Sequence, residues 1–199
     1  MPNPPEHVRS FIAINLPPEV MAKLAEFQRE FHAAVPGDDV RWTGPEQIHL
    51  TLRFLGNIAK SELSQVEDAL RRGCQGVGPF ALRARGAGCF PDIRQPRIVW
   101  VGFDGALDHL MRLEAAITRE TERWGEREER EFHPHLTLGR VKKPSRDLAS
   151  ALGRHLEQAR QRDFGSWQVE QVDLMQSDLS SAGPRYTRLA GVRLASGSA

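Results

Sequence analysis

The sequence predicts an α+β protein made of two related lobes. Short apolar segments typical of strands alternate with amphipathic segments typical of helices along the whole chain. The tetrapeptide His-Leu-Thr-Leu occurs twice, at residues 49–52 and 135–138, and in each half one predicted helix precedes it and another follows it. Similarity between the halves is weak outside the tetrapeptide, so the symmetry is a hypothesis that rests on the order of the elements.

Length and composition favour one globular domain over residues 1–199. The chain has 40% hydrophobic and 27% charged residues, which is typical of soluble proteins. No apolar run approaches the roughly 20 residues of a membrane helix, and the N-terminus lacks a secretory-signal pattern. The net charge of +1 argues against a protein that coats long nucleic acids, but it permits a local basic site for a phosphate group.

The two cysteines, Cys74 and Cys89, have no metal-ligand spacing and are too few for a disulfide framework. A reducing compartment, the cytoplasm, is therefore expected. Nothing in the sequence requires a protein partner, and a monomer is expected.

The first half of the chain alternates strands with helices. Pro17 and Pro18 open a helix over residues 19–34 whose apolar side chains share one face, and "PGDD" ends it. Ser61 is expected to cap a second helix that ends near Arg72. The predicted strands cover residues 10–16, 40–43, 48–55 and 80–85.

The second half repeats this alternation. Helices are predicted over residues 107–124 and from Pro144 and Ser145 to 162, and strands over 97–103, 135–141, 169–175 and 186–194. The charged segment 125–131 is expected to be a solvated connector. Residues 195–199, "ASGSA", are expected to be a disordered tail.

Alternation of side chains along a strand separates polar from apolar residues in both tetrapeptides. The leucines and Phe54 are expected on an apolar face that packs into the core. The residues expected on the polar face are His49, Thr51 and Arg53 in the first copy and His135 and Thr137 in the second.

Two such polar faces suit one kind of chemistry. A pair of imidazoles can supply a general base and a general acid near neutral pH. A hydroxyl two residues further along the same face can donate a hydrogen bond to a phosphoryl oxygen held between them. Neither a serine or cysteine nucleophile nor a carboxylate pair stands beside the motifs. The pattern therefore indicates in-line attack on a phosphodiester.

The two tetrapeptides lie within five ordered blocks: "RSFIAINLPPEV", "VRWTGPEQIHLTLRFLGNI", "GCFPDIRQPRIVWVGF", "EFHPHLTLGRVK" and "SDLSSAGPRYTRLA". Together they resemble the two-histidine (2H) phosphoesterase superfamily, and within it the RNA 2′,3′-cyclic phosphodiesterases, also called 2′-5′ RNA ligases. The resemblance implies two lobes, each a mainly antiparallel sheet with helices on its outer face, and an active-site cleft between them.

The same resemblance implies an enzyme that hydrolyses RNA 2′,3′-cyclic phosphate ends to 2′-phosphates. Reverse 2′-5′ ligation would be an additional reaction, and no metal or other cofactor would be needed. Its substrates would be RNA ends or cyclic nucleotides. His49 would be the proton donor, His135 the proton acceptor, and Thr51 and Thr137 would bind phosphoryl oxygens. The residues alone do not separate acid from base, because the site is nearly symmetric.

Two arginines are further candidates for substrate binding. The resemblance puts Arg140 near the phosphate, but strict alternation turns it away from His135, so a bulge or a strand end is required. Arg53 would assist from the face of His49, unless it is simply a solvated arginine. His133 and His135 could both ligate a metal, but no third ligand with suitable spacing exists, so no metal site is predicted.

Four aromatic residues, Trp42, Phe54, Phe90 and Tyr186, could stack on a nucleobase, although such residues more often pack in the core. Tyr186 and Trp42, beside polar loops, are the better candidates, and Phe54 is assigned to the apolar face of its strand. Two other functions stay open. One is a phosphodiesterase that acts on another small cyclic nucleotide or on a 2′-5′ oligonucleotide. The other is a nucleotide-binding module without catalysis, against which the presence of both histidines and both threonines argues.

Overall fold

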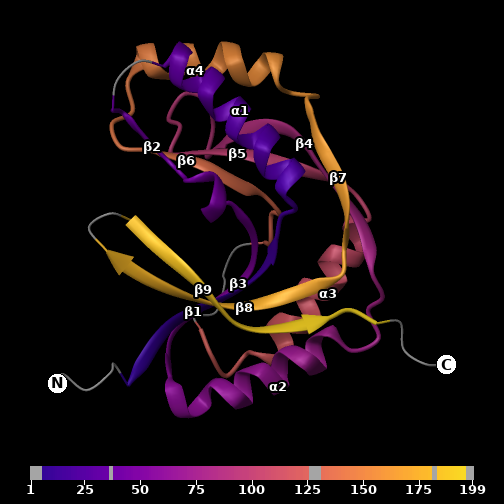
Figure 1. Ribbon diagram of the computed structural model, residues 1–199. Helices are drawn as coiled ribbons and strands as arrows, with labels where there is room; N and C mark the ends of the chain where they lie inside the picture. Colours follow the sequence, from indigo (N-terminus) through magenta and orange to yellow (C-terminus); the bar gives the residue numbers. More distant parts are fainter. Residues whose placement is uncertain (1–5, 36–37, 126–130, 181–182, 196–199) are drawn as a thin grey trace.

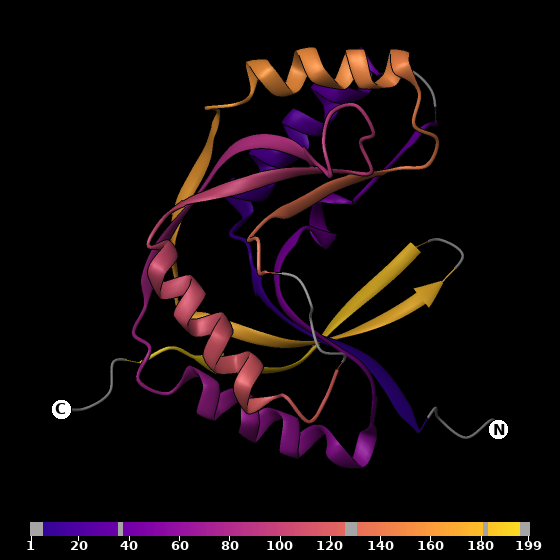
Figure 2. The ribbon, with the colours of Figure 1, turned by 180° about the vertical axis from the view of Figure 1, so that it is seen from behind.

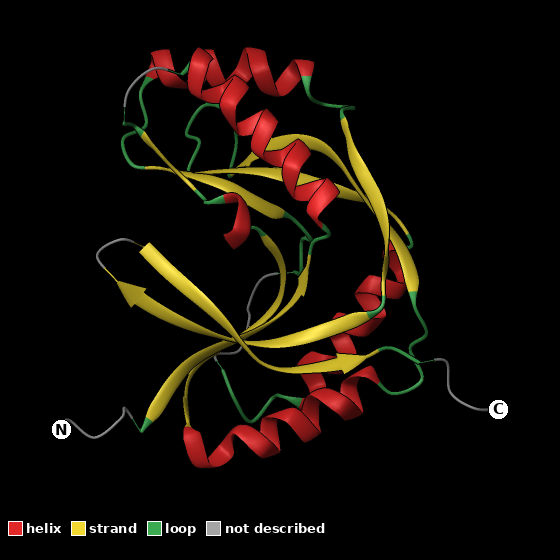
Figure 3. Ribbon diagram, viewed as in Figure 1, coloured by secondary structure: helices red, strands yellow, loops and turns green. Residues whose placement is uncertain are grey.

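The computed structural model describes residues 6–35, 38–125, 131–180 and 183–195, and it consists of one curled sheet with helices outside (Figures 1 and 3). The sheet has nine strands in the order β7-β4-β5-β6-β3-β1-β8-β9, and β2 pairs with β6. Every strand pair is antiparallel. Most of the predicted charged connector and the predicted tail, at 126–130 and 196–199, lie outside the described residues.

The bounds of the elements are as follows. The strands are β1 (His7–Asn15), β2 (Val40–Trp42), β3 (His49–Ala59), β4 (Phe80–Phe90), β5 (Ile98–Gly105), β6 (Leu136–Val141), β7 (Asp163–Val169), β8 (Gln171–Ser180) and β9 (Gly183–Arg193). The helices are α1 (Pro18–Ala34), α2 (Leu63–Cys74), α3 (Leu107–Glu120) and α4 (Arg146–Gln158). Two short 3-10 helices cover Pro45–Gln47 and Lys60–Glu62.

The sheet divides into two lobes where β3 meets β6. These two strands share a single paired position, Leu50 opposite Leu136, whereas β1 and β3 pair along nine positions. Helices α1 and α4 cover the outer face of β2, β4, β5, β6 and β7, and helices α2 and α3 cover the other lobe (Figures 1 and 2). The predicted α+β class, with antiparallel sheets and helices on the outer faces, is confirmed.

The lobes are not the two halves of the chain. The first half supplies α1 to one lobe and α2 to the other, and the second half supplies α3 and α4 in the opposite order. The two His-Leu-Thr-Leu strands, β3 and β6, are the neighbours that join the lobes. The tertiary structure therefore brings the two copies of the motif together at the joint.

Apolar side chains of the helices fill the space beneath the sheet. On α1, Val20, Leu24, Phe27 and Phe31 are at most 2% exposed, and burial of such a side chain contributes about 1.5–3 kcal/mol. The spacing of apolar residues along the sequence correctly identified this face. No helix among the described residues is long and apolar enough to cross a bilayer.

Three predicted helices need correction, and one strand was missed. Ser61 does not cap α2, which begins at Leu63 after a 3-10 turn. Helix α4 begins at Arg146, close to the predicted start, and the Ser145 hydroxyl caps it by accepting a hydrogen bond from the Leu148 amide. Helices α3 and α4 end four residues earlier than predicted. Strand β7 was not predicted, because "DFGSWQV" contains few apolar residues and a glycine with a φ of 114°.

Candidate active site

The register of β3 and β6 sets the two histidines on opposite sides of the Leu50–Leu136 pair. The strands run antiparallel, and each histidine directly precedes its leucine. In an antiparallel ladder such residues are diagonal neighbours, about 7–8 Å apart. Both leucines are fully buried, whereas both histidines are only partly buried. His49 and His135 therefore share one face, with room for a small group between them.

Backbone carbonyls orient both imidazole rings in the same way. The Nδ1 atom of His49 lies 2.8 Å from the Gln47 carbonyl oxygen, and that of His135 lies 2.7 Å from the His133 carbonyl oxygen. A carbonyl oxygen only accepts, so Nδ1 donates its proton in each contact. Nε2 is then the nitrogen of each ring that exchanges a proton with a ligand.

Partial burial shifts the titration of both rings. Desolvation lowers the pKa of His49 below its ordinary value of 6.5, and the hydrogen bond to Gln47 opposes this shift. Desolvation likewise lowers the pKa of His135, and the nearby positive charges of Arg140 and His133 lower it further, while the bond to the His133 carbonyl opposes the shift. Both imidazoles are therefore more easily deprotonated than a histidine in water.

The two motif strands carry a bulge at the same position of the tetrapeptide. Thr51 pairs with Ala13 and Arg53 with Ile12, so Leu52 is the extra residue of β3. On β6, Thr137 pairs with Trp100 and Gly139 with Val99, so Leu138 is the extra residue. A bulge shifts the alternation of all later side chains. Phe54, five residues after His49, and Arg140, five residues after His135, therefore return to the face of the histidines.

In β3 the bulge reverses the predicted positions of Arg53 and Phe54. Arg53 is only 4% exposed and points away from His49, and its Nη2 atom donates to the Trp124 carbonyl at 3.0 Å. Phe54 is 53% exposed. The prediction that Arg53 shares the face of His49 is therefore wrong, and so is the assignment of Phe54 to the core, because both assumed strict alternation.

In β6 the bulge supplies the shift that Arg140 requires. Arg140 is exposed, and its charge acts on both His135 and Tyr186, which come from different lobes. Its strand neighbour on β2, Arg41, also acts on Tyr186. Arg41 was missed in the sequence, although alternation with the inward-facing Val40 and Trp42 would have indicated it.

Aromatic rings surround His49. Phe11 on β1 stacks on its imidazole with ring centroids 4.7 Å apart, and Tyr186 on β9 meets it edge-on at 5.1 Å. The Gln47 side chain donates a hydrogen bond to the Pro184 carbonyl at 2.6 Å. This bond ties the β8–β9 hairpin to the segment that precedes β3. Burial raises the pKa of Tyr186, so its hydroxyl stays protonated at neutral pH. Phe11 gave no sequence signal, because it begins an uninterrupted apolar run, residues 11–14, that is typical of a buried strand.

His135 has its own aromatic neighbour and a cavity beside it. The Phe90 ring meets the imidazole edge-on, with centroids 5.2 Å apart. Phe90, His133 and His135 line a cavity of about 520 Å³. Phe90 is only partly buried, so of the two roles left open for it, the structure does not favour the core.

Trp42 lies away from both histidines. Its ring packs against Phe31 and His32 of α1, at centroid distances of 5.7 and 5.2 Å, and against the backbone of Gly139. The prediction that Trp42 stacks on a nucleobase is therefore not supported. Within the described ranges, no three His, Cys, Asp or Glu side chains group closely enough to hold a metal ion.

Comparisons with known proteins identify the family of the chain. The family model for LigT-like phosphoesterases matches the chain twice, over residues 14–100 and 102–186. The chain belongs to the LigT-like phosphoesterase family. It is 35% identical over 188 residues to the RNA 2′,3′-cyclic phosphodiesterase of Methanothermobacter thermautotrophicus, and the alignment covers 94% of this chain and 99% of that protein.

Solved structures of related proteins have the same fold over nearly the whole chain. A crystal structure of a Thermus thermophilus protein matches with a TM-score of 0.72 and 32% identity, over 94% of this chain and 97% of the other. The complex of E. coli LigT with 3′-AMP matches with a TM-score of 0.74 and 26% identity, over 95% and 99%. Each segment matched by the family model contains one His-Leu-Thr-Leu copy.

Proposed function

We propose that this protein hydrolyses RNA 2′,3′-cyclic phosphate ends to 2′-phosphates. One observation carries the proposal: two histidines share a face at the joint of the lobes, and a carbonyl oxygen holds each Nδ1 so that Nε2 is available. Two Nε2 atoms on opposite sides of a bound phosphorus suit in-line displacement, with one proton removed and one delivered. The relative from M. thermautotrophicus is named for this reaction, which supports the choice of substrate.

In the proposed reaction, His135 takes a proton from water as the water oxygen attacks phosphorus. The bond from phosphorus to the 3′ oxygen breaks, and His49 protonates that oxygen, which leaves a 2′-phosphate. This division of roles follows the family resemblance, because the geometry around the two rings is nearly the same. The proposal includes 2′-5′ ligation, in which a 5′-hydroxyl takes the place of water and the histidines keep these roles. The roles exchange when a 2′-5′ linkage is cleaved.

Three side chains are proposed to bind the phosphoryl group. Thr51 and Thr137 lie two residues after the histidines, are partly exposed, and can donate hydroxyl hydrogen bonds to its oxygens. Arg140 carries a charge that reaches His135, so its guanidinium can stabilise negative charge that develops on those oxygens. Tyr186, packed against His49, is proposed to contact the nucleoside.

The test is a hydrolysis assay with 2′,3′-cyclic AMP and with an RNA that ends in a cyclic phosphate, in the presence of EDTA. The proposal expects a 2′-phosphate product from both. Each of the variants His49→Ala and His135→Ala should lose about 10²–10⁴-fold in kcat, which is the usual contribution of general acid–base catalysis. His109→Ala, in which an exposed histidine of α3 is replaced, is the matched control.

Near-normal turnover in either motif variant would show that the two-histidine mechanism is wrong. Loss of activity with EDTA would favour a metal bound at His133 and His135 instead. Hydrolysis of small cyclic nucleotides without hydrolysis of RNA ends would favour the other phosphodiesterase function. Tight binding of the cyclic nucleotide without turnover would favour a binding module.

A further inference from the structure

The cavity beside His135 extends away from the two motifs along β4 and β5. Among the residues that line it are Trp100 on β5, Arg85 on β4 and Arg160, which follows α4. No Asp or Glu of the described residues lines it. The Trp100 indole forms an aromatic wall, and the two arginines supply guanidinium groups. A space lined in this way, without a carboxylate, suits an anionic ligand that has a flat ring.

Two glycines shape the aromatic wall. A Cβ atom at Gly88, which is paired with Trp100, would lie 2.6 Å from the indole Cη2 atom, and one at Gly102 would lie 3.3 Å from Cζ3. Any larger residue at Gly88 would therefore displace the ring. With glycine at both positions, the indole lies against the backbone of β4 and β5 and beside the Phe90 ring, at a centroid distance of 5.1 Å, and it lines the cavity. Trp100 is thus placed as a platform on which a nucleobase can stack.

A bulge brings the two arginines to the same rim. Gly86, with a φ of 70°, is the extra residue of β4 between Arg85 and Ala87. The amide of Gly86 donates to the Arg162 carbonyl at 2.8 Å, which ties the bulge to the turn that follows α4 and carries Arg160. A side chain at position 86 would clash with the Arg160 carbonyl, because its Cβ would lie 2.8 Å from that oxygen.

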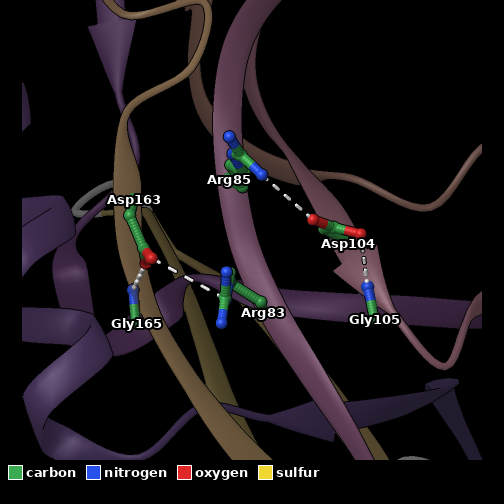
Figure 4. A network of polar contacts seen from close by, with 6 residues as sticks. All are labelled: Arg83, Arg85, Asp104, Gly105, Asp163 and Gly165. Atoms are coloured by element: carbon green, nitrogen blue, oxygen red, sulfur yellow. Dashed lines mark hydrogen bonds and ion pairs between the residues drawn. The ribbon is translucent and has the colours of Figure 1, made fainter.

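Neither arginine is saturated by its ion pair. Figure 4 shows Arg85 beside Asp104 of β5, whose Oδ2 atom lies 3.3 Å from Nη1. Arg160 lies 3.6 Å from Glu157, and both side chains are more than 70% exposed, so this pair is weak. A guanidinium has five N–H donors, so both groups retain donors for a phosphate.

The position of the cavity relative to the reaction identifies its occupant. In the proposed mechanism, His135 deprotonates the nucleophile while the 3′ oxygen departs towards His49. His135 lines the cavity, so the cavity opens on the side of the phosphorus from which the nucleophile arrives. In hydrolysis this nucleophile is water, and in ligation it is a nucleoside 5′-hydroxyl. We propose that the cavity binds the nucleotide that carries the 5′ oxygen of a 2′-5′ linkage. Its base stacks on Trp100, and its 3′-phosphate lies between Arg85 and Arg160.

The inference rests on the proposed function. Bonds and protons balance in both ligation and cleavage. In ligation, the 5′ oxygen forms a bond to phosphorus, its proton passes to His135, the bond from phosphorus to the 3′ oxygen breaks, and His49 protonates that oxygen. In cleavage, the 3′-hydroxyl gives its proton to His49 and attacks the phosphorus of the 2′-5′ linkage. The bond from phosphorus to the 5′ oxygen breaks, and this oxygen leaves with a proton from His135. The products of cleavage are a 2′,3′-cyclic phosphate and a free 5′-hydroxyl.

The test compares two substrates: 2′,3′-cyclic AMP, which has no second nucleotide, and a 2′-5′-linked diadenylate whose 5′-linked nucleoside carries a 3′-phosphate. The readout is kcat/KM for the diadenylate divided by kcat/KM for 2′,3′-cyclic AMP. In the double variant Arg85→Gln/Arg160→Gln this ratio should fall at least tenfold. Removal of the 3′-phosphate should raise KM for the diadenylate about tenfold in the unmodified protein and should have no effect in the double variant.

Arg83→Gln is the matched control. Arg83 lies two residues before Arg85 on the same strand and pairs with Asp163 at 3.7 Å, but it does not line the cavity (Figure 4). The ratio should be unchanged in this variant. An unchanged ratio in the double variant, an equal fall in Arg83→Gln, or hydrolysis of cyclic AMP without any cleavage of the diadenylate would overturn the inference. Failure to hydrolyse cyclic AMP would instead overturn the proposed function.

Discussion

The bulge at Leu52 decides which of two neighbouring residues, Arg53 or Phe54, reaches the face of His49. Strict alternation assigns that face to Arg53, but in the structure Arg53 is buried beneath the strand and Phe54 is exposed. We therefore expect Arg53→Ala to lower the stability of the fold and to leave the KM for 2′,3′-cyclic AMP unchanged. Phe54→Ala should instead leave the stability nearly unchanged and raise the KM for 2′,3′-cyclic AMP.

The contacts of Arg53 set the size of the stability loss. Truncation to alanine removes two buried methylene groups, which contribute about 0.8 kcal/mol each. It also removes the hydrogen bond to the Trp124 carbonyl, which contributes about 1.5–3 kcal/mol, while the 3.5 Å contact with Thr118 adds little. Relief of the cost of burying a charge offsets part of this, so the net loss is about 2 kcal/mol.

Thermal unfolding and steady-state kinetics on the same preparations measure both effects. A loss of about 2 kcal/mol lowers Tm by about 4–8 °C in a chain of this length. Phe54→Ala should change Tm by less than about 2 °C, because its side chain is exposed. It should raise KM about tenfold, in line with the loss of one stacking contact. A tenfold rise in KM for Arg53→Ala with an unchanged Tm would refute the reasoning and restore strict alternation.

Three further predictions concern pH, capping and thiols. Burial lowers the pKa of both His49 and His135 below 6.5. In the proposed mechanism, the productive state has His135 neutral and His49 protonated. The pH profile of kcat/KM should therefore be bell-shaped with its maximum below pH 6.5, and a maximum above pH 8 would contradict the assignment. Ser145→Ala removes a helix cap and should cost about 1 kcal/mol without changing kcat, as measured by chemical denaturation and the hydrolysis assay. Burial raises the pKa of Cys74 to about 12, so Ellman's reagent should label only the more accessible Cys89 in the native protein at pH 8, and rapid labelling of two thiols would contradict this.

Local patterns in the sequence determined much of the fold. The spacing of apolar residues on α1 identified the face that is buried, because a helix repeats every 3.6 residues whatever it packs against. Alternation in the two tetrapeptides set His49 and Thr51 on the face opposite Leu50, because side chains of neighbouring residues point to opposite sides of a strand. The start of α4 was predicted from Pro144 and Ser145, because the residues that open a helix act within its first turn.

Elements with weak local patterns depended on their neighbours. Strand β7 exists because "DFGSWQV" finds a partner in β4, with Trp167 opposite Leu82 and Ser166 opposite Arg83. Pairing of this kind joins residues about eighty positions apart, and no local propensity encodes it. The same holds for Phe11, whose ring stacks on the imidazole of His49, although the register of β1 on β3 sets Phe11 opposite Phe54.

Composition, periodicity and the repeated tetrapeptide by themselves determined the α+β class, the faces of the main helices and the polar residues His49, Thr51, His135 and Thr137. Only the tertiary structure decided how the two motifs meet, through the single Leu50–Leu136 pair. It also decided where the alternation breaks, because a bulge depends on the register with a neighbouring strand. Those two bulges turn Arg53 into the core and bring Phe54 and Arg140 to the face of the histidines.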